Sequence, residues 1–150
     1  IINDMFDTMN NAFGCGLAAP QIGENINLFI TEIPDDSCEF LIKKIFINPV
    51  FEILDNNSLN SMDEGCLSLP NITVPVKRFS KIKTTYFDEN WIKKEEVLND
   101  FESRVFLHEY DHLIGKMIID YLDEKKIKDL SKELENIEKK NFKKNNILYK

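Results

Sequence analysis

Long apolar runs are absent from this sequence, and several residue types are scarce. No stretch approaches the roughly 18 consecutive apolar residues of a membrane-spanning helix, and no signal-peptide layout is visible, so no membrane association is expected. The 19 basic residues are outnumbered by 26 acidic ones, and the net charge of −7 argues against general binding of DNA or other nucleic acids. The three cysteines have no paired spacing, which fits a reducing cytoplasm better than a disulfide scaffold.

Apolar residues are nevertheless plentiful enough for a core. The 150 residues are 43% hydrophobic and include 11 Phe, which predicts one globular domain over 1–150. The sequence starts at Ile1 rather than Met, with Met5, Phe6 and Met9 already in helical spacing, so we expect an N-terminal segment to be missing. Charge is uneven along the chain, because nine Lys and six acids fall within 123–150.

Histidine occurs only twice, and both copies fall in the segment His108-Glu109-Tyr110-Asp111-His112. Random placement would space two histidines by four about one time in 75, so chance is a poor explanation. Residues four apart share one face of a helix, which lets both imidazoles hold one metal ion. Glu109 can then reach a water on that metal and act as general base. A helix with two surface histidines is the alternative interpretation.

Two glycine-containing segments could complete such a site. Residues 14–23 (GCGLAAPQIG) combine small residues, which allow close backbone approach, with the neutral amide of Gln21. Taken alone, this segment is equally consistent with a plain loop, and it lacks the lysine and glycine spacing of phosphate-binding loops. Cys66 taken alone would be a small buried hydrophobe. Beside two histidines that lack a third ligand, however, its thiolate is a good candidate.

The hydrophobic pattern predicts both helices and strands. Helices are expected over 1–12, 101–113 and 124–140, with Gly115 ending the second and a frayed tail after the third. The first is expected to face the core with Ile2, Met5, Phe6, Met9 and Phe13, and the third to carry an apolar stripe of Ile127, Leu130, Leu134 and Ile137. Strands are expected over 27–33, 72–76, 81–86, 93–98 and 117–121, with a hairpin turn at 88–90. The stretch 40–54 is predicted to form two strands broken near Asn48-Pro49.

Three motifs, GCGLAAPQ, EGCLS and HEYDH, occur in this order and resemble the signature motifs of the peptide deformylases. These enzymes remove the formyl group from the initiating methionine of bacterial and organellar proteins. The resemblance covers nearly the whole chain. It implies an α+β fold in which antiparallel sheets pack around a central helix carrying HExxH, with a C-terminal helix.

The resemblance also implies a ligand set and a cofactor. Cys66, His108 and His112 would hold one divalent metal ion and leave its fourth position for water. Family members typically use Fe(II) in the cell, and Ni, Co or Zn can replace it in the purified protein. Glu109 would take a proton from the metal-bound water and pass it to the leaving amine. The Gln21 amide and the backbone N–H of Leu67 would hold the oxyanion.

Substrate contacts follow from the same resemblance. The backbone at Gly14 and Gly16 would line the peptide groove, where the substrate pairs as an extra strand. The methionine pocket would be lined by Phe101, Val105 and the aliphatic stem of Arg104. Arg78 matches a family arginine that pairs with Glu64, although a solvated strand residue is the alternative. Asp111, which directly precedes His112 in the HEYDH motif, is expected to support the site rather than to take part in catalysis.

The resemblance also bears on the partners and the location of the chain, and two alternative functions are open. The resemblance implies N-formylmethionyl peptides and nascent chains as substrates, and the cytoplasm of a bacterium or the stroma or matrix of an organelle. A monomer is the default expectation. The Lys-rich end after Asp123 fits ribosome docking through the C-terminal helix, with a solvated helix face as the alternative. An HExxH metalloprotease would leave Cys66 unexplained. A catalytically degenerate ribosome-docking relative with a structural, four-ligand metal site is disfavoured by the intact Glu109 and Gln21.

Overall fold

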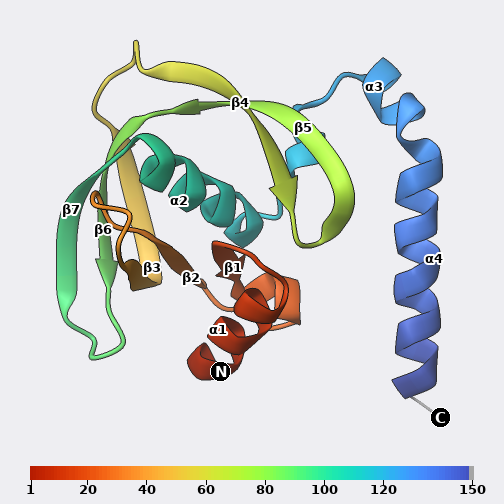
Figure 1. Cartoon of the computed structure of the whole chain (residues 1–150), viewed down its shortest axis with the longest axis horizontal. Coiled ribbons are helices and arrows are strands. Elements are labelled where there is room, and N and C mark those ends of the chain that lie inside the picture. The colour runs from red at the N-terminus through yellow and green to blue at the C-terminus, as the bar shows by residue number, and fades with distance from the viewer. Residues whose placement is uncertain (149–150) are drawn as a thin grey trace.

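The computed structural model describes the backbone of residues 1–148 and the side chains of 1–141 (Figure 1). Its helices are α1 (Ile2–Asn11), the 3-10 helix η1 (Ala19–Ile22), α2 (Asp100–Leu113), the 3-10 helix η2 (Ile118–Tyr121), α3 (Glu124–Asp129) and α4 (Ser131–Leu148). Its strands are β1 (Gly16–Ala18), β2 (Leu28–Pro34), β3 (Leu41–Ile53), β4 (Leu59–Cys66), β5 (Leu69–Phe79), β6 (Lys81–Phe87) and β7 (Lys93–Asn99).

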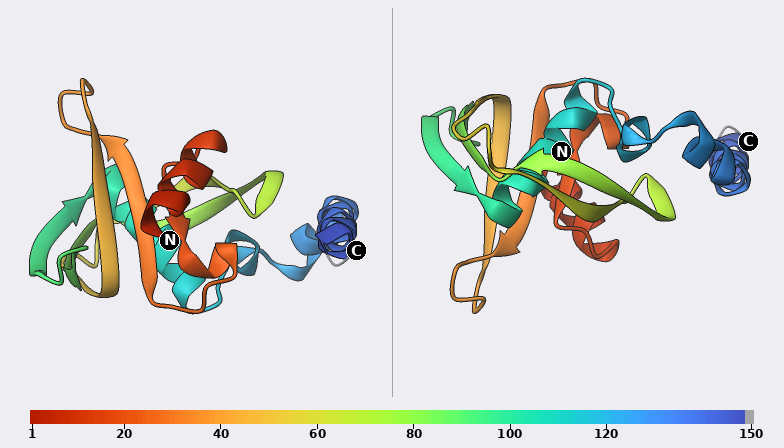
Figure 2. Two further views of the ribbon diagram at one scale, coloured as in Figure 1. Left: turned by 90° about the horizontal axis from the view of Figure 1, so that it is seen from below. Right: turned by 90° about the horizontal axis from the view of Figure 1, so that it is seen from above.

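The described strands form two antiparallel sheets with α2 between them. Five strands pair in the order β1-β2-β3-β6-β7, and β4 pairs with β5 in a long two-stranded hairpin. Helix α2 packs against strands of both sheets, as Figures 1 and 2 show from three directions. The expected combination of antiparallel sheets with C-terminal helical structure is therefore confirmed. No helix in the described part of the chain is long and apolar enough to cross a membrane.

An aromatic core fixes the rotation of α2. Phe106 is fully buried and meets Phe29 and Phe46 edge-on, with ring centroids 5.1 and 5.3 Å apart. Such edge-to-face pairs add to the free energy gained by burying apolar surface. Because Phe106 points at the large sheet, His108 and His112 are turned toward the β4–β5 hairpin. The helix ends where expected, since Gly115 adopts φ +74° and the Lys116 N–H bonds back to the Asp111 carbonyl.

Helix α1 confirms the predicted N-terminal stripe except at Phe13, which was expected to face the core and is exposed. Met5, Phe6 and Met9 are buried against the apolar side chains of β1 and β2. This packing places the end of α1 beside the start of β1. Gly14 lies in the loop between these elements and Gly16 begins β1, so the helix helps to hold the first motif in place.

Three secondary-structure predictions were wrong. Residues 40–54 form the single strand β3, because the break at Asn48-Pro49 is absorbed as a bulge between Ile47 and Val50. Residues 117–121 form η2 rather than a strand, with the Asp120 carboxylate accepting the Met117 N–H. The expected helix over 124–140 is divided at Leu130 into α3 and α4, and α4 then continues to Leu148 instead of fraying.

Helix α4 stands at one side of the molecule (Figures 1 and 2). Leu130, Leu134 and Ile137 pack against the apolar cluster of β5 that includes Val74 and Val76. Three residues of the predicted stripe are therefore used, Leu130 just before α4 and Leu134 and Ile137 within it, whereas Ile127 in α3 is exposed. Its other side is polar and exposed, with Lys139 and Lys140 facing solvent.

Candidate active site

Three candidate metal-ligating atoms meet beside α2. One side-chain donor each from Cys66, His108 and His112 lies within 4.8 Å of the other two, and Cys66 Sγ is 3.4 Å from His112 Nε2. Cys66 ends β4, where the pairing with β5 shifts register after Gly65, and the two histidines come from successive turns of α2. One sulfur and two nitrogen donors suit a metal site that keeps one coordination position open for chemistry.

The environment of Cys66 favours the thiolate, which is the form that binds metal. Burial alone would raise the pKa of this thiol. Hydrogen bonds with His108 and His112 outweigh burial and lower the pKa from 9.0 to about 6. The residues present therefore fit a divalent cation of the kind that soft and imidazole ligands select.

Glu109 lies beside these donors with its carboxylate buried. Only 4% of the residue is exposed, and burial raises the pKa of its carboxyl from 4.5 to about 7. Its Oε2 has no hydrogen-bond partner among the described residues. A Cβ atom added at Gly16 would lie 2.8 Å from both Cγ and Cδ of Glu109, so the first motif leaves room for this carboxylate. A buried carboxylate with a free oxygen beside a ligand cluster is suited to proton transfer.

Gln21 and Leu67 bring amide donors to the same place. The Gln21 Oε1 accepts the Ala18 N–H at 2.8 Å, and its Nε2 donates to Ser68 Oγ at 3.0 Å and lies 3.8 Å from Cys66 Sγ. The amide group is thus oriented with its N–H groups toward the site. Leu67 follows Cys66 in the turn between β4 and β5. The sequence interpretation missed Ser68, although it belongs to the EGCLS motif.

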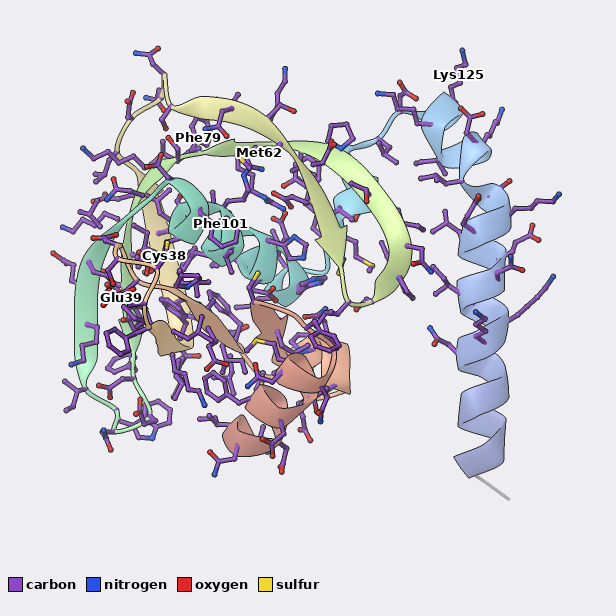
Figure 3. The ribbon with its side chains drawn as sticks, viewed as in Figure 1. Cys38, Glu39, Met62, Phe79, Phe101 and Lys125 are labelled. Carbon is purple, nitrogen blue, oxygen red and sulfur yellow. The ribbon has the colours of Figure 1, made fainter. Side chains whose placement is uncertain are left out.

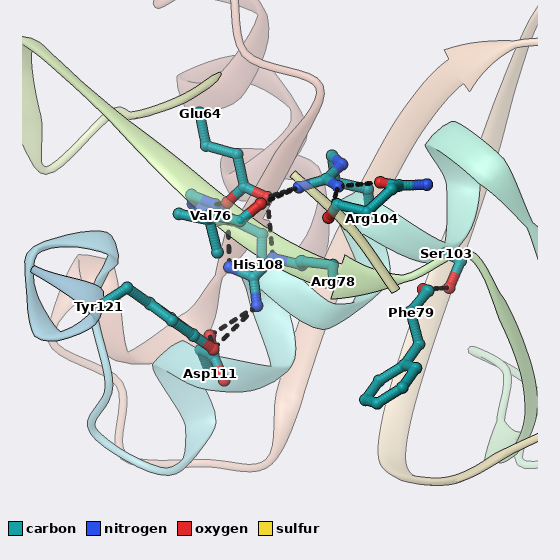
Figure 4. A network of polar contacts seen from close by, with 10 residues as sticks. Glu64, Val76, Arg78, Phe79, Ser103, Arg104, His108, Asp111 and Tyr121 are labelled. Carbon is teal, nitrogen blue, oxygen red and sulfur yellow. Dashed lines mark hydrogen bonds and ion pairs between the residues drawn. The ribbon is translucent and has the colours of Figure 1, made fainter. Parts of the chain in front are cut away.

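A buried ionic network holds the His108 ring through its Nδ1 atom (Figure 4). The Glu64 Oε2 lies 2.9 Å from His108 Nδ1, and Arg78 binds the same carboxylate through Nε and Nη2 at 2.8 and 3.0 Å. Arg104 Nη1 adds a contact of 2.7 Å to Glu64 Oε1. A carboxylate on the second nitrogen of a ligating histidine orients the ring and increases its basicity. The alternative of a solvated Arg78 is wrong, because only 4% of it is exposed.

The network continues to η2. Arg78 Nη1 donates to Asp111 Oδ2 at 2.8 Å, and the Tyr121 hydroxyl donates to the same oxygen at 2.7 Å. Asp111 therefore supports Arg78 and does not contact the three donors. No sequence pattern predicted the role of Tyr121, because Asp111, its hydrogen-bond partner, lies ten residues earlier on a different element.

The stabilising role of Glu64 predicts that the free energy of unfolding depends on pH. Burial would raise its pKa, but hydrogen bonds from His108, Arg78 and Arg104 lower it from 4.5 to about 2. A carboxyl with a lowered folded-state pKa stabilises the protein above its unfolded pKa, and this contribution is lost as the pH falls. We expect the free energy of unfolding of the metal-free protein to drop by about 3 kcal/mol between pH 4.5 and pH 2.

Denaturant titrations at a series of pH values would measure this dependence. The Glu64→Gln variant carries no titrating group at this position. Its free energy of unfolding should therefore show a clearly shallower decline over the same pH range. An equal decline in the native protein and the variant would show that other carboxyls control unfolding by acid.

A cavity of about 640 Å³ opens in front of the cluster. Every predicted substrate contact lines it, namely Gly14, Gly16, Phe101, Arg104 and Val105. The guanidinium of Arg104 is occupied by Glu64 and by Asn60, whose Oδ1 accepts from Nη2, so the arginine offers its stem to the cavity. Met62 of β4 also lines the cavity and was missed by the sequence interpretation (Figure 3).

Fold and site together define an α+β protein with a helical HExxH motif and a cysteine as the third candidate metal ligand. The model of the polypeptide deformylase family matches residues 1–128. The peptide deformylase of Karelsulcia muelleri is 46% identical over 121 residues, which cover 80% of this chain and 62% of that protein. That of Cytophaga hutchinsonii is 40% identical over 138 residues, covering 91% of this chain and 74% of that protein.

Solved structures agree with these relatives. A plant peptide deformylase (PDF1B) superposes with a TM-score of 0.82 at 32% identity, covering 95% of this chain and 77% of that one. The peptide deformylase of Plasmodium falciparum in complex with an inhibitor gives a TM-score of 0.77 at 31% identity, covering 92% and 82%. The chain belongs to the peptide deformylase family. Members of this family are metal-dependent hydrolases that remove the N-formyl group from nascent peptides.

Proposed function

We propose that this chain is a catalytically active peptide deformylase, which hydrolyses the N-formyl group of the initiating methionine and releases formate. The observation that carries the proposal is the meeting of the Cys66, His108 and His112 donors with the buried, partly unpartnered carboxylate of Glu109. Helix α2 would be the central catalytic helix of a single domain. The chain spans 62% of the Karelsulcia muelleri relative, so its own activity needs direct measurement.

Cys66, His108 and His112 would hold the metal, which supplies Lewis acidity at the formyl oxygen and lowers the pKa of a water. Glu109 accepts a proton from the attacking water and delivers it to the leaving amine. The Gln21 side chain and the Leu67 N–H donate hydrogen bonds to the developing oxyanion. The rigid contacts of Gln21 with Ala18 and Ser68 support this role, because preorganised donors need no rearrangement during the reaction.

We propose Fe(II) as the metal in the cell, with Ni, Co or Zn able to replace it in the purified protein. The mixed donor set supports this range, because thiolate and imidazole together suit all four metals. The carboxylate of Glu64 binds His108 at Nδ1 and so orients the ring with Nε2 available to any of them.

The substrate methionine would enter the cavity beside Phe101, Val105 and the stem of Arg104. The peptide would pair with β1, which lies at one edge of the five-stranded sheet and has only β2 as a partner there. The backbone at Gly14 and Gly16 and the turn after Cys66 line the same cavity, which supports an extended peptide between them.

Association with the ribosome through α4 is a separate proposal. The helix stands out from the body with Lys139 and Lys140 exposed, while the side chains of Lys143 and Lys144 lie outside the described ones. We place the enzyme as a monomer in a bacterial cytoplasm or an organelle. Charge reversal at Lys139 and Lys140 should weaken cosedimentation with ribosomes, and an unchanged fraction would remove this proposal.

Release of formate from formyl-Met-Ala-Ser, measured anaerobically with Fe(II) or Ni(II), tests the proposed reaction. Turnover is expected with either metal. No turnover with metal demonstrably bound would favour a degenerate, ribosome-docking relative. Cleavage of internal peptide bonds, together with unchanged metal content in Cys66→Ala, would instead favour an HExxH metalloprotease.

A further inference from the structure

Phe13 is an unusual residue for its place in the fold. It lies two residues after the last residue of α1, adopts φ +57° and leaves 97% of its surface exposed. Its N–H bonds to the Asn10 carbonyl, and the Gly14 N–H bonds to the Met9 carbonyl, so the positive φ belongs to the helix-ending turn. Glycine or asparagine normally occupies such a position, since a Cβ is strained there. The sequence thus places a large apolar side chain where neither local conformation nor core packing favours it.

The ring lies at the mouth of the candidate active site. Phe13 lines the 640 Å³ cavity on the α1 side, and Pro70 and Asn71 of the β4–β5 hairpin line it as well. The loop is held firmly, because a Cβ on Gly14 would lie 2.7 Å from Leu67 Cδ1 and the Cys15 carbonyl accepts the Glu32 N–H. The backbone at Phe13 is therefore held at this mouth.

We infer that Phe13 determines specificity by favouring substrates with an apolar side chain in the first two positions after the methionine. The inference rests on the proposed deformylase function. With the methionine in the cavity, an extended peptide leaves the site past the residues at its mouth, and its side chains point alternately to opposite sides. Contact between an exposed aromatic ring and an apolar side chain removes both from water and is favourable.

Three peptides test the inference: formyl-Met-Leu-Ser, formyl-Met-Ser-Leu and formyl-Met-Ser-Ser. We expect the native enzyme to favour at least one leucine peptide over the all-serine peptide by about tenfold in kcat/KM, an effect typical of one hydrophobic contact. Phe13→Asn should bring this ratio close to one, because asparagine accepts the positive φ and is polar. Phe13→Tyr, which keeps the ring, should retain most of the preference.

Trp91 provides a matched control. It is also an aromatic residue with positive φ (+60°) and a largely exposed side chain (65%), but it lies between β6 and β7 and does not line the cavity. Trp91→Asn should leave the peptide ratio unchanged. A fall in the ratio in Trp91→Asn equal to that in Phe13→Asn would overturn the inference, since the effect would then be general.

The outcomes separate this inference from the proposed function. Turnover of all three peptides at equal rates by the native enzyme, or a ratio that survives in a folded Phe13→Asn, would overturn the role of Phe13 and leave the deformylase function standing. Failure of the metal-loaded native enzyme on every formyl peptide would remove both. Thermal melting of Phe13→Asn verifies folding, and its melting temperature should not fall below the native value, because asparagine adopts the positive φ with less strain.

Discussion

Replacing Glu109 with Gln should reduce formate release by about a thousandfold or more while leaving the metal in place. The amide keeps the shape of the side chain but cannot accept a proton from water or return one to the leaving amine. Cys66, His108 and His112 keep their geometry, so polarisation of the formyl group remains as the residual catalysis. Steady-state kinetics together with elemental analysis of the purified variant would separate the two effects.

Glu32 offers a matched control for this substitution. It is the other described residue with a buried, unpartnered carboxylate oxygen, and it lies on β2 outside the residues that line the cavity. Glu32→Gln should therefore have nearly native turnover. Activity of Glu109→Gln near the native value would show that another group transfers the proton, and loss of metal from it would assign Glu109 to the ligand set.

The free energy of unfolding gives a second readout for Glu109. Burial raises the pKa of its carboxyl to about 7, so the ionised form is disfavoured in the folded, metal-free protein. Glu109→Gln should for that reason be at least as stable as the native protein without metal. Functional groups commonly carry such a stability penalty.

The parts of the site that the sequence predicted correctly are local ones. His108 and His112 are one helical turn apart, so their common face follows from α2 alone. The stripe of Met5, Phe6 and Met9 likewise defines α1 without reference to the rest of the chain. That Cys66 joins the histidines required the family resemblance, because it lies 42 positions before His108, with three strands between them.

The missed features depend on long-range contacts. Strand β4 has the sequence LNSMDEGC, which lacks apolar alternation, and it is held by pairing with β5 along its length. Because β4 was not predicted from the sequence, two of its residues could not be assigned a role: Met62, which lines the cavity, and Asn60, which accepts a hydrogen bond from Arg104. The buried network around Arg78 similarly joins β4, β5, α2 and η2. No periodicity in the sequence predicts that ionic side chains from four elements are buried together.

Replacing Gly16 with Ala should lower kcat by about a hundredfold through Glu109. A Cβ at this position would lie 2.8 Å from Cγ and Cδ of the glutamate, closer than side-chain carbons approach in folded proteins. Helix α2 is anchored by Phe106 in the core, so the carboxylate has to move rather than the helix. A displacement of about 1 Å of a catalytic group can reduce the rate about a hundredfold. Metal content should be unchanged, because no ligand is touched.

Two further variants decide whether Gly16 acts through Glu109. Gly65→Ala is the matched control, since its Cβ would approach nothing closer than the Ile72 carbonyl at 3.9 Å and kcat should change little. In the double variant Gly16→Ala/Glu109→Gln, the two losses should not multiply, because the first substitution acts on a carboxylate that the second removes. Multiplicative losses would instead assign Gly16 to peptide binding, where the missing side chain lets the substrate backbone approach β1.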